Sequence, residues 1–256
     1  MIVTITFETK VWEKDWELIL KTSRLEKILS RCNHEFDKKI LLINNVSQFD
    51  KVASQAERLI KKGVLTEFIN VDQHASDALD YFDLTKESLG NGYYYSIAEL
   101  VSLYLSSSKY LLHFSGDSMI DVNAPQDWLN TGLNILENEP LIKVVNLGWQ
   151  NFDSTLNEEF IAEANGYFSS FGFSDQMYLV RTDDFKDRIF NFYHPLSDRY
   201  PKHAGQLFEK RVDSWLRLHN YYRATLKNGR YLHRNFTNVP WEKKLSILLN
   251  QSDLFS

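Results

Sequence analysis

The sequence predicts an α/β protein whose mixed, mainly parallel central sheet is flanked by helices. Two observations predict this class. Strand-like and helix-like segments alternate in the order β-α-β-α-β over the first 72 residues, as expected for parallel strands joined by helical crossovers. One of these strands, KILLI at 39–43, is an uninterrupted apolar run, which is typical of a strand covered by helices on both faces.

Hydrophobic periodicity predicts five elements in this first stretch, and Gly63 is placed to end the second helix. They are a strand at 2–7, a helix at 12–31, a strand at 39–43, an amphipathic helix at 49–60 and a strand at 65–71 that closes with Asp72.

From 73 to 95 the periodicity fades into a polar segment that ends in NGYYY, which predicts a loop with at most a short helix. Ser96 then begins a helix through Ser107, with Glu99 completing a capping box. This helix leads to YLLHFSGDSMI at 110–120, a strand that runs directly into a turn ending in Asp117. Ligands of α/β proteins gather at the carboxyl ends of strands, so we expect chemistry at this turn.

The second half contains weaker signals, no internal repeat and no clear linker, so we expect one continuous domain over 1–256. The predicted elements are a helix at 125–136, strands at 142–147 and 177–180, a helix at 184–192, a turn-rich connector at 195–201, a strong helix at 206–223 and a short terminal helix within 230–256.

Composition excludes several classes of protein. The net charge is −5 and no run of Lys or Arg is long enough for a nucleic-acid-binding arm. Cys32 is the only cysteine, which excludes an internal disulfide and a zinc site built on several thiolates. The sequence has neither a signal-peptide pattern nor an apolar run of the ~20 residues that a membrane helix needs, so a soluble, cytoplasmic protein is expected.

Four familiar catalytic motifs are missing from the sequence. There is no GxGxxG after the first strand, no GxxxxGK[ST], no HExxH and no GxSxG. These absences disfavour a dehydrogenase, a kinase, a zinc protease and an α/β-hydrolase.

Four phrases at the predicted strand ends carry a resemblance to a known family. They are INNVSQFD at 43–50, YLLHFSGDSMI at 110–120, GFSDQMYLVRTDDF at 172–185 and AGQLFEKRV at 204–212. Their order and character resemble a nucleotide-sugar glycosyltransferase of the GT-A (Rossmann-like) type, close to the family 2 inverting enzymes, over about residues 1–235. The resemblance implies a nucleotide-sugar-binding half at 1–122 and an acceptor-binding half at 123–256.

The resemblance places Ser115, Gly116 and Asp117 on the family's DXD metal motif, with Ser115 where the first carboxylate belongs. It implies that Asp117 binds Mn²⁺ or Mg²⁺, with His233 completing the metal site. The departure at Ser115 implies weaker metal binding, or metal-independent activity, or none. Without the resemblance, Asp117 is an ordinary solvated loop residue and His233 a structural or surface histidine.

The resemblance also implies a set of donor-binding residues. They are Phe7, Glu8, Asn44, Asn45, Asp72, Ser115, Gly116, Asp117 and Arg181. Asn44 and Asn45 also suit a plain turn and Asp72 a plain loop. Arg181 and Arg234 suit phosphate oxygens, although a carboxylate partner is the commoner fate of an arginine.

Transfer to a hydroxyl requires a base that takes the acceptor proton. Glu209, which matches the family's acid at a helix start, and Asp175 are the candidates, with Glu209 slightly preferred. A surface ion pair of Glu209 with Lys210 or Arg211 explains the sequence equally well, and Asp175 is also a suitable acceptor contact or turn residue.

Three functions remain open. The first is a glycosyltransferase that moves a sugar from a nucleoside-diphosphate sugar to a saccharide or lipid-linked saccharide acceptor, as in polysaccharide biosynthesis. The second, favoured by the loss of the first DXD carboxylate, is a catalytically inactive GT-A-like domain that binds a sugar, a nucleotide or a partner. The third is an unrelated α/β enzyme that acts on nucleotides.

Overall fold

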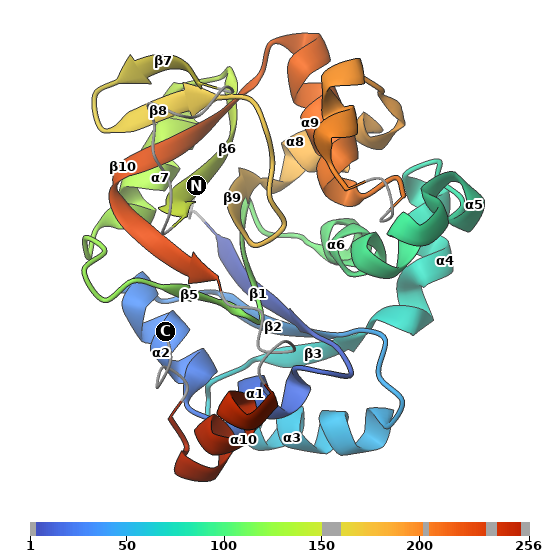
Figure 1. Ribbon diagram of the computed structural model, residues 1–256, viewed down its shortest axis with the longest axis vertical. Coiled ribbons are helices and arrows are strands. Elements are labelled where there is room, and N and C mark those ends of the chain that lie inside the picture. The colour runs from blue at the N-terminus through green and yellow to red at the C-terminus, as the bar shows by residue number, and fades with distance from the viewer. Residues whose placement is uncertain (1–3, 150–159, 202–204, 234–239, 252–256) are drawn as a thin grey trace.

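A single mixed sheet runs through the computed structural model, which describes residues 4–149, 160–201, 205–233 and 240–251 (Figure 1). Along the sheet the strands lie in the order β3-β2-β1-β4-β9-β6-β10-β8-β7, and β5 pairs with β10. The strands are β1 (Ile5–Val11), β2 (Lys38–Ile43), β3 (Glu67–Asn70), β4 (Tyr110–Ser115), β5 (Ser118–Ile120), β6 (Ile142–Trp149), β7 (Phe160–Ala164), β8 (Tyr167–Ser170), β9 (Met177–Arg181) and β10 (Tyr222–His233).

The described strands form a mixed sheet with four parallel and five antiparallel pairings. β1 pairs in parallel with β2 and β4, β2 with β3, and β6 with β10. β9 is antiparallel to both of its neighbours, β4 and β6. The predicted α/β class with a mixed sheet is confirmed. Because β9 runs against β4, it begins at the edge where β4 ends, and this brings the residues before Met177 beside the turn after Ser115.

Helices cover both faces of the sheet (Figure 1). On one face α4 and α6 pack on β2, and α6 and α9 pack on β4 and β9; on the other, α1 and α3 pack on β1 and β2, and α2 and α7 on the middle of the sheet. The helices are α1 (Trp16–Lys21), α2 (Arg24–Cys32), α3 (Phe49–Lys61), α4 (Val71–Tyr81), α5 (Lys86–Leu89), α6 (Tyr93–Leu105), α7 (Trp128–Asn138), α8 (Thr182–Lys186), α9 (Phe208–His219) and α10 (Pro240–Leu249), with 3₁₀ turns η1 (Gly90–Gly92), η2 (Ile189–Asn191) and η3 (Pro195–Arg199). Of the helices described, none is both long and apolar enough to cross a membrane.

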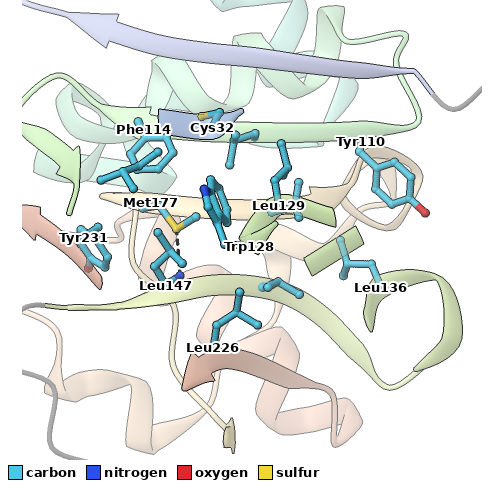
Figure 2. Packing of buried hydrophobic residues seen from close by; sticks show 14 of the residues in the cluster. Cys32, Tyr110, Phe114, Trp128, Leu129, Leu136, Leu147, Met177, Leu226 and Tyr231 are labelled. Atoms are coloured by element: carbon cyan, nitrogen blue, oxygen red, sulfur yellow. Dashed lines mark hydrogen bonds between the residues drawn. The ribbon is translucent and has the colours of Figure 1, made fainter. Parts of the chain in front are cut away.

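The largest core cluster lies between the sheet and helices α2 and α7 (Figure 2). Trp128 of α7 is at its centre, 1% exposed, near Phe114 and Met177 (Figure 2). Alternation along β1 decides which side chains enter this core, because successive side chains of a strand point to opposite faces. Phe7 joins the cluster, whereas Glu8 contacts Ser102 of α6 on the opposite face.

Several predicted boundaries are wrong. β1 extends to Val11, past the predicted end at 7. The helix predicted at 12–31 is two helices, because the chain is extended at Thr22, the C-cap of α1. The predicted helices at 184–192 and 206–223 are shorter, and the second ends at Asn220, whose left-handed φ of 53° stops it. The chain then enters β10, a strand that the helical pattern concealed.

The segment at 73–95 is not the predicted loop, because α4, α5 and the start of α6 occupy most of it. Asn70 caps α4 by accepting a hydrogen bond from the Asp72 backbone N–H at 3.2 Å. The capping box predicted at Ser96 and Glu99 is also wrong, since α6 begins at Tyr93 and both residues are buried inside it. Ser96 Oγ instead accepts a hydrogen bond from the Phe208 backbone N–H at 2.8 Å, which joins α6 to the start of α9.

Candidate active site

A pocket of about 200 Å³ lies at the carboxyl ends of β1, β2 and β4. Parallel strands bring their carboxyl ends to one edge of the sheet, so residues distant in sequence meet here. The pocket is lined by Lys10, Val11, Trp12, Asp15, Asn44, Asn45, Tyr94, Tyr95, Ser115, Gly116, Asp117, Asp175, Gln176 and His233. Seven of the residues named from the sequence line it: Asn44, Asn45, Ser115, Gly116, Asp117, Asp175 and His233.

The turn after β4 presents Asp117 to this pocket. Ser115 Oγ donates a hydrogen bond to Asp117 Oδ1 at 2.8 Å, so Ser115 orients this carboxylate. Gly116 is required because of space: a Cβ there would lie 2.1 Å from Ile19 Cδ1 and 3.0 Å from the Lys10 carbonyl oxygen. The backbone of the turn is therefore packed directly on β1 and α1.

His233 reaches Asp117 from the end of β10. The antiparallel pairing of β10 with β5 sets His233 opposite Ser118, the residue after Asp117. His233 Nε2 lies 3.1 Å from Asp117 Oδ2. Burial raises the pKa of Asp117, but His233, Ser115 and the charge of Arg24 together outweigh it and the net shift is downward. Burial lowers the pKa of His233, and Asp117 reverses that shift so that the net change is upward.

Lys10 holds two carboxylates at the base of the pocket. Its Nζ lies 3.0 Å from Asp175 Oδ2 and also contacts Glu99 of α6. Burial raises the pKa of Asp175, yet the charge of Lys10 outweighs this and keeps the pKa below its usual range. Burial dominates at Glu99 and raises its pKa despite the same lysine. The cluster therefore keeps Asp175 ionised at the pocket wall.

Glu209 lies behind Asp175 and does not line the pocket. Its Oε1 accepts a hydrogen bond from the Asp175 backbone N–H at 2.8 Å. Burial, followed by the nearby charge of Asp175, raises the pKa of Glu209 well above its usual value. Glu209 is therefore held against the Asp175 backbone, and not in the surface ion pair with Lys210 or Arg211 that the sequence allowed.

Aromatic side chains form another wall of the pocket. Trp12 and Tyr94 meet edge to face with ring centroids 6.2 Å apart, and Tyr94 and Tyr95 are 39% and 51% exposed. Asn45 Nδ2 donates to the Tyr94 carbonyl oxygen at 2.9 Å, and Asn45 tolerates the left-handed φ of 51° found there. Sequence reasoning did not assign the other seven lining residues, which are Lys10, Val11, Trp12, Asp15, Tyr94, Tyr95 and Gln176, nor Glu99 behind Lys10. The sequence NGYYY was the one visible signal of the aromatic wall.

Two residues assigned to the donor site lie inside the protein. Phe7 is fully buried and stacks on Phe114 at a centroid distance of 6.4 Å. Glu8 is also fully buried, and its Oε1 lies 2.8 Å from His113 Nδ1. Burial raises the pKa of Glu8 and lowers that of His113 to about 3, so the contact is a neutral hydrogen bond and not an ion pair. Their placement follows from the extension of β1 to Val11.

Two further assigned residues lie away from the pocket. Asp72 is exposed in the first turn of α4. Because β9 is antiparallel to β4, Arg181 pairs with Tyr110 at the start of β4. It therefore lies at the end of the strands that is remote from the pocket. Its guanidinium binds Asp184 at 2.7 Å and donates to the Ile142 carbonyl oxygen at 2.8 Å, so the carboxylate pairing considered from the sequence is the observed one. Arg234 lies outside the described residues.

The side chains present fit a divalent cation only as an open site. Within the described ranges, no group of three or more His, Cys, Asp or Glu side chains is arranged to hold a metal ion. The pair of Asp117 and His233 offers a carboxylate oxygen and an imidazole nitrogen, which Mn²⁺ accepts. Mg²⁺ and similar ions are often held by one or two carboxylates together with substrate phosphates. A cation held by Asp117 and His233 would therefore need further ligands from a bound substrate or water.

Solved structures that are similar to this chain include the following three. Glucosyl-3-phosphoglycerate synthase from Mycobacterium tuberculosis, in complex with UDP and Mn²⁺, is 13% identical over 100% of this chain and 82% of its own, with a TM-score of 0.47. TarS 1–349 from S. aureus, in complex with UDP-GlcNAc, is 11% identical over 97% and 66%, with a TM-score of 0.48. A mycobacterial protein is 12% identical over 100% and 76%, with a TM-score of 0.50.

In sequence, no protein-family model and no curated protein matches the chain. At identities of 11–13%, the structural likeness concerns the fold alone.

Proposed function

We propose that the chain is a glycosyltransferase that moves a sugar from a nucleoside-diphosphate sugar to a hydroxyl of a saccharide or lipid-linked saccharide. The observation that carries the proposal is the meeting of Asp117 and Asp175 in one pocket at the carboxyl ends of the parallel strands, together with the aromatic side chains of Trp12, Tyr94 and Tyr95. One carboxylate serves the diphosphate end of the donor and the other serves the acceptor hydroxyl.

Donor binding is assigned to the side of the pocket formed by β1, β2 and β4. The rings of Trp12 and Tyr94 provide apolar surface for a nucleobase, and Asn44 and Asn45 provide amide groups for its polar edge or the ribose. Asp117 and His233 would hold Mn²⁺ or Mg²⁺. When bound, the metal neutralises the diphosphate and makes it a better leaving group.

Acceptor activation is assigned to Asp175. As the acceptor oxygen forms a bond to the anomeric carbon, the bond from that carbon to the diphosphate oxygen breaks, and the hydroxyl proton passes to the Asp175 carboxylate. Lys10 keeps Asp175 ionised and fixes one of its oxygens at 3.0 Å. This assignment reverses the order expected from the sequence, because Asp175 lines the pocket whereas Glu209 supports its backbone from behind.

Two substitutions test this assignment. Asp175→Asn removes the base and keeps its size, so kcat should fall by about 10²–10⁴-fold with nucleotide binding unchanged. Glu209→Gln keeps an oxygen that accepts from the Asp175 N–H, so kcat should fall by less than about tenfold. The measurement is transfer from a radiolabelled nucleotide sugar, with calorimetric binding of the nucleotide as the control. Loss of transfer in the glutamine variant alone would reassign the base to Glu209.

The replacement of a DXD carboxylate by Ser115 supports one alternative, a GT-A-like domain that binds a nucleotide or a sugar without catalysis. For such a domain, the same assays should give nucleotide binding without sugar transfer in the wild type. Asp175→Asn and Glu209→Gln should then leave both readouts unchanged.

A further inference from the structure

A second pocket adjoins the first on the side of β6 and β10. It has a volume of about 260 Å³ and is lined by Asn146, Trp149, Ser174, Gln176, Arg223, Thr225 and Tyr231. Gln176 lines both pockets. Its backbone oxygen accepts from the Ser115 N–H at 2.9 Å, and its Oε1 accepts from the Tyr231 hydroxyl at 3.0 Å. The shared wall is thus fixed to β4 on one side and β10 on the other.

The lining of the second pocket combines an exposed ring with polar groups. Trp149, at the end of β6, is 43% exposed, which is unusual for so large an apolar side chain at a pocket. Thr225 Oγ1 donates to Asn146 Oδ1 at 2.9 Å, a bond that does not use the amide hydrogens of Asn146. A saccharide ring has one apolar face and a rim of hydroxyls, and this lining offers a surface to each.

The charge of the lining points to the class of saccharide. In the part of the chain that the structure describes, Arg223 is the one cation of the lining and no carboxylate contributes to it. Arg223 Nη2 donates to Ser170 Oγ at 2.9 Å, which anchors the guanidinium on β8. A held guanidinium selects carboxylate or phosphate groups.

We propose that this pocket is the acceptor subsite and that it takes a saccharide carrying an anionic group, with the ring on Trp149 and the carboxylate or phosphate at Arg223. The proposal rests on the glycosyltransferase function proposed above. Asp175 precedes Gln176 in the chain and lines the first pocket, so the proposal requires the reacting hydroxyl of the acceptor to lie at the Gln176 side of this pocket, next to Asp175.

Saturation-transfer NMR on the full chain tests the subsite with three probes: glucuronic acid, glucose 6-phosphate and glucose. Both acids should bind about tenfold more tightly than glucose, the effect of one charge-assisted hydrogen bond. Trp149→Ala should remove the signal of all three, and Trp149→Phe should retain most of it. Trp241→Ala, which removes an exposed ring that lines neither pocket, is the matched control and should change nothing.

Arg223→Gln should reduce the affinity for both acids to that for glucose. Equal binding of glucose and the acids by the wild type would overturn the anionic class, and an unchanged signal in Trp149→Ala would overturn the site. Binding of UDP, GDP, CMP and dTDP is measured in parallel by calorimetry. Binding of one of these nucleotides without saccharide binding refutes the subsite and leaves the proposed function standing; saccharide binding without binding of any of the four refutes the proposed function and, with it, the acceptor role of this pocket.

Discussion

At the scale of single residues, the electrostatics of the pocket depend on Lys10. Its ammonium lies between Asp175, which is 29% exposed at the pocket, and Glu99, which is fully buried on α6. Burial lowers the pKa of Lys10, but the two carboxylates outweigh this effect and the net shift is upward. Lys10 therefore remains charged. A buried charge is tolerated only with such partners, and the arrangement therefore ties α6 to the candidate base.

Removing this charge should shift the pH dependence of transfer. Asp175 accepts a proton only when ionised, so activity falls at low pH as Asp175 is protonated. Lys10→Met removes the charge that holds the pKa of Asp175 down, and the acid limb of kcat/KM should move to higher pH by about 1–3 units. Lys10→Arg should keep the limb near its original position.

The matched control is Lys143→Met. Lys143 is 13% exposed and lies 2.9 Å from Asp184, outside the lining of both pockets. Its removal should leave the acid limb unchanged. An acid limb that does not move in Lys10→Met would show that Lys10 does not set the protonation of the base.

At the scale of elements, the turn between β4 and β5 is positioned by contact with α1. Substituting Gly116 by Ala drives a methyl group into Ile19 Cδ1 and against the Lys10 carbonyl oxygen. The first obstacle is the end of a side chain, and the second is backbone. The turn must therefore shift, and Asp117 must shift with it.

Gly116→Ala should lower the free energy of unfolding by about 1–3 kcal/mol and weaken nucleotide binding. Ile19→Val removes the Cδ1 methyl and costs about 0.5–1.5 kcal/mol alone. The double variant should be more stable than the sum of the two changes predicts, because the larger clash is gone. Urea unfolding of the four proteins measures this coupling. Strictly additive losses would contradict the contact as the cause.

The elements differ in how well the sequence predicts them. The apolar run of β2 and the regular stripe of α3 were predicted to within one residue because each has a strong local period. α4 was missed because its polar, Asp-rich face hides the few buried side chains Val71, Ala75 and Ala78. The start of β10 was missed because Tyr222, its first residue, fits the apolar spacing of α9, and that spacing gives no sign that the helix has already ended at Asn220.

The candidate site was predictable where the signal is local and unpredictable where it depends on tertiary pairing. Asp117 follows a buried strand and was found from that position alone. Glu99 had the spacing of a capping box, and only the packing of α6 on β1 shows it bound to Lys10. Arg181 was misplaced because nothing in its own segment states that β9 runs antiparallel.

At the scale of the whole molecule, the sheet brings together groups from both halves of the chain. Asp117 comes from the turn after β4, Asp175 from the segment before β9, and His233 from the end of β10. β10 pairs with β6, β8 and β5, so it joins the second pocket to the turn that carries Asp117. A ligand that bridges these groups must stabilise the fold as a whole, because they lie on separate elements.

The most direct test of the central claim, that the first pocket binds a nucleotide sugar, is the melting temperature of the protein with UDP, GDP, CMP and dTDP sugars, with and without Mn²⁺. At a concentration of 100 Kd, a ligand adds about 2.7 kcal/mol, which for a chain of this size raises Tm by roughly 5–10 °C. We expect such a rise with one nucleotide in the presence of Mn²⁺, and its loss in Asp117→Asn. A cooperative transition that none of the nucleotide sugars shifts would contradict the account.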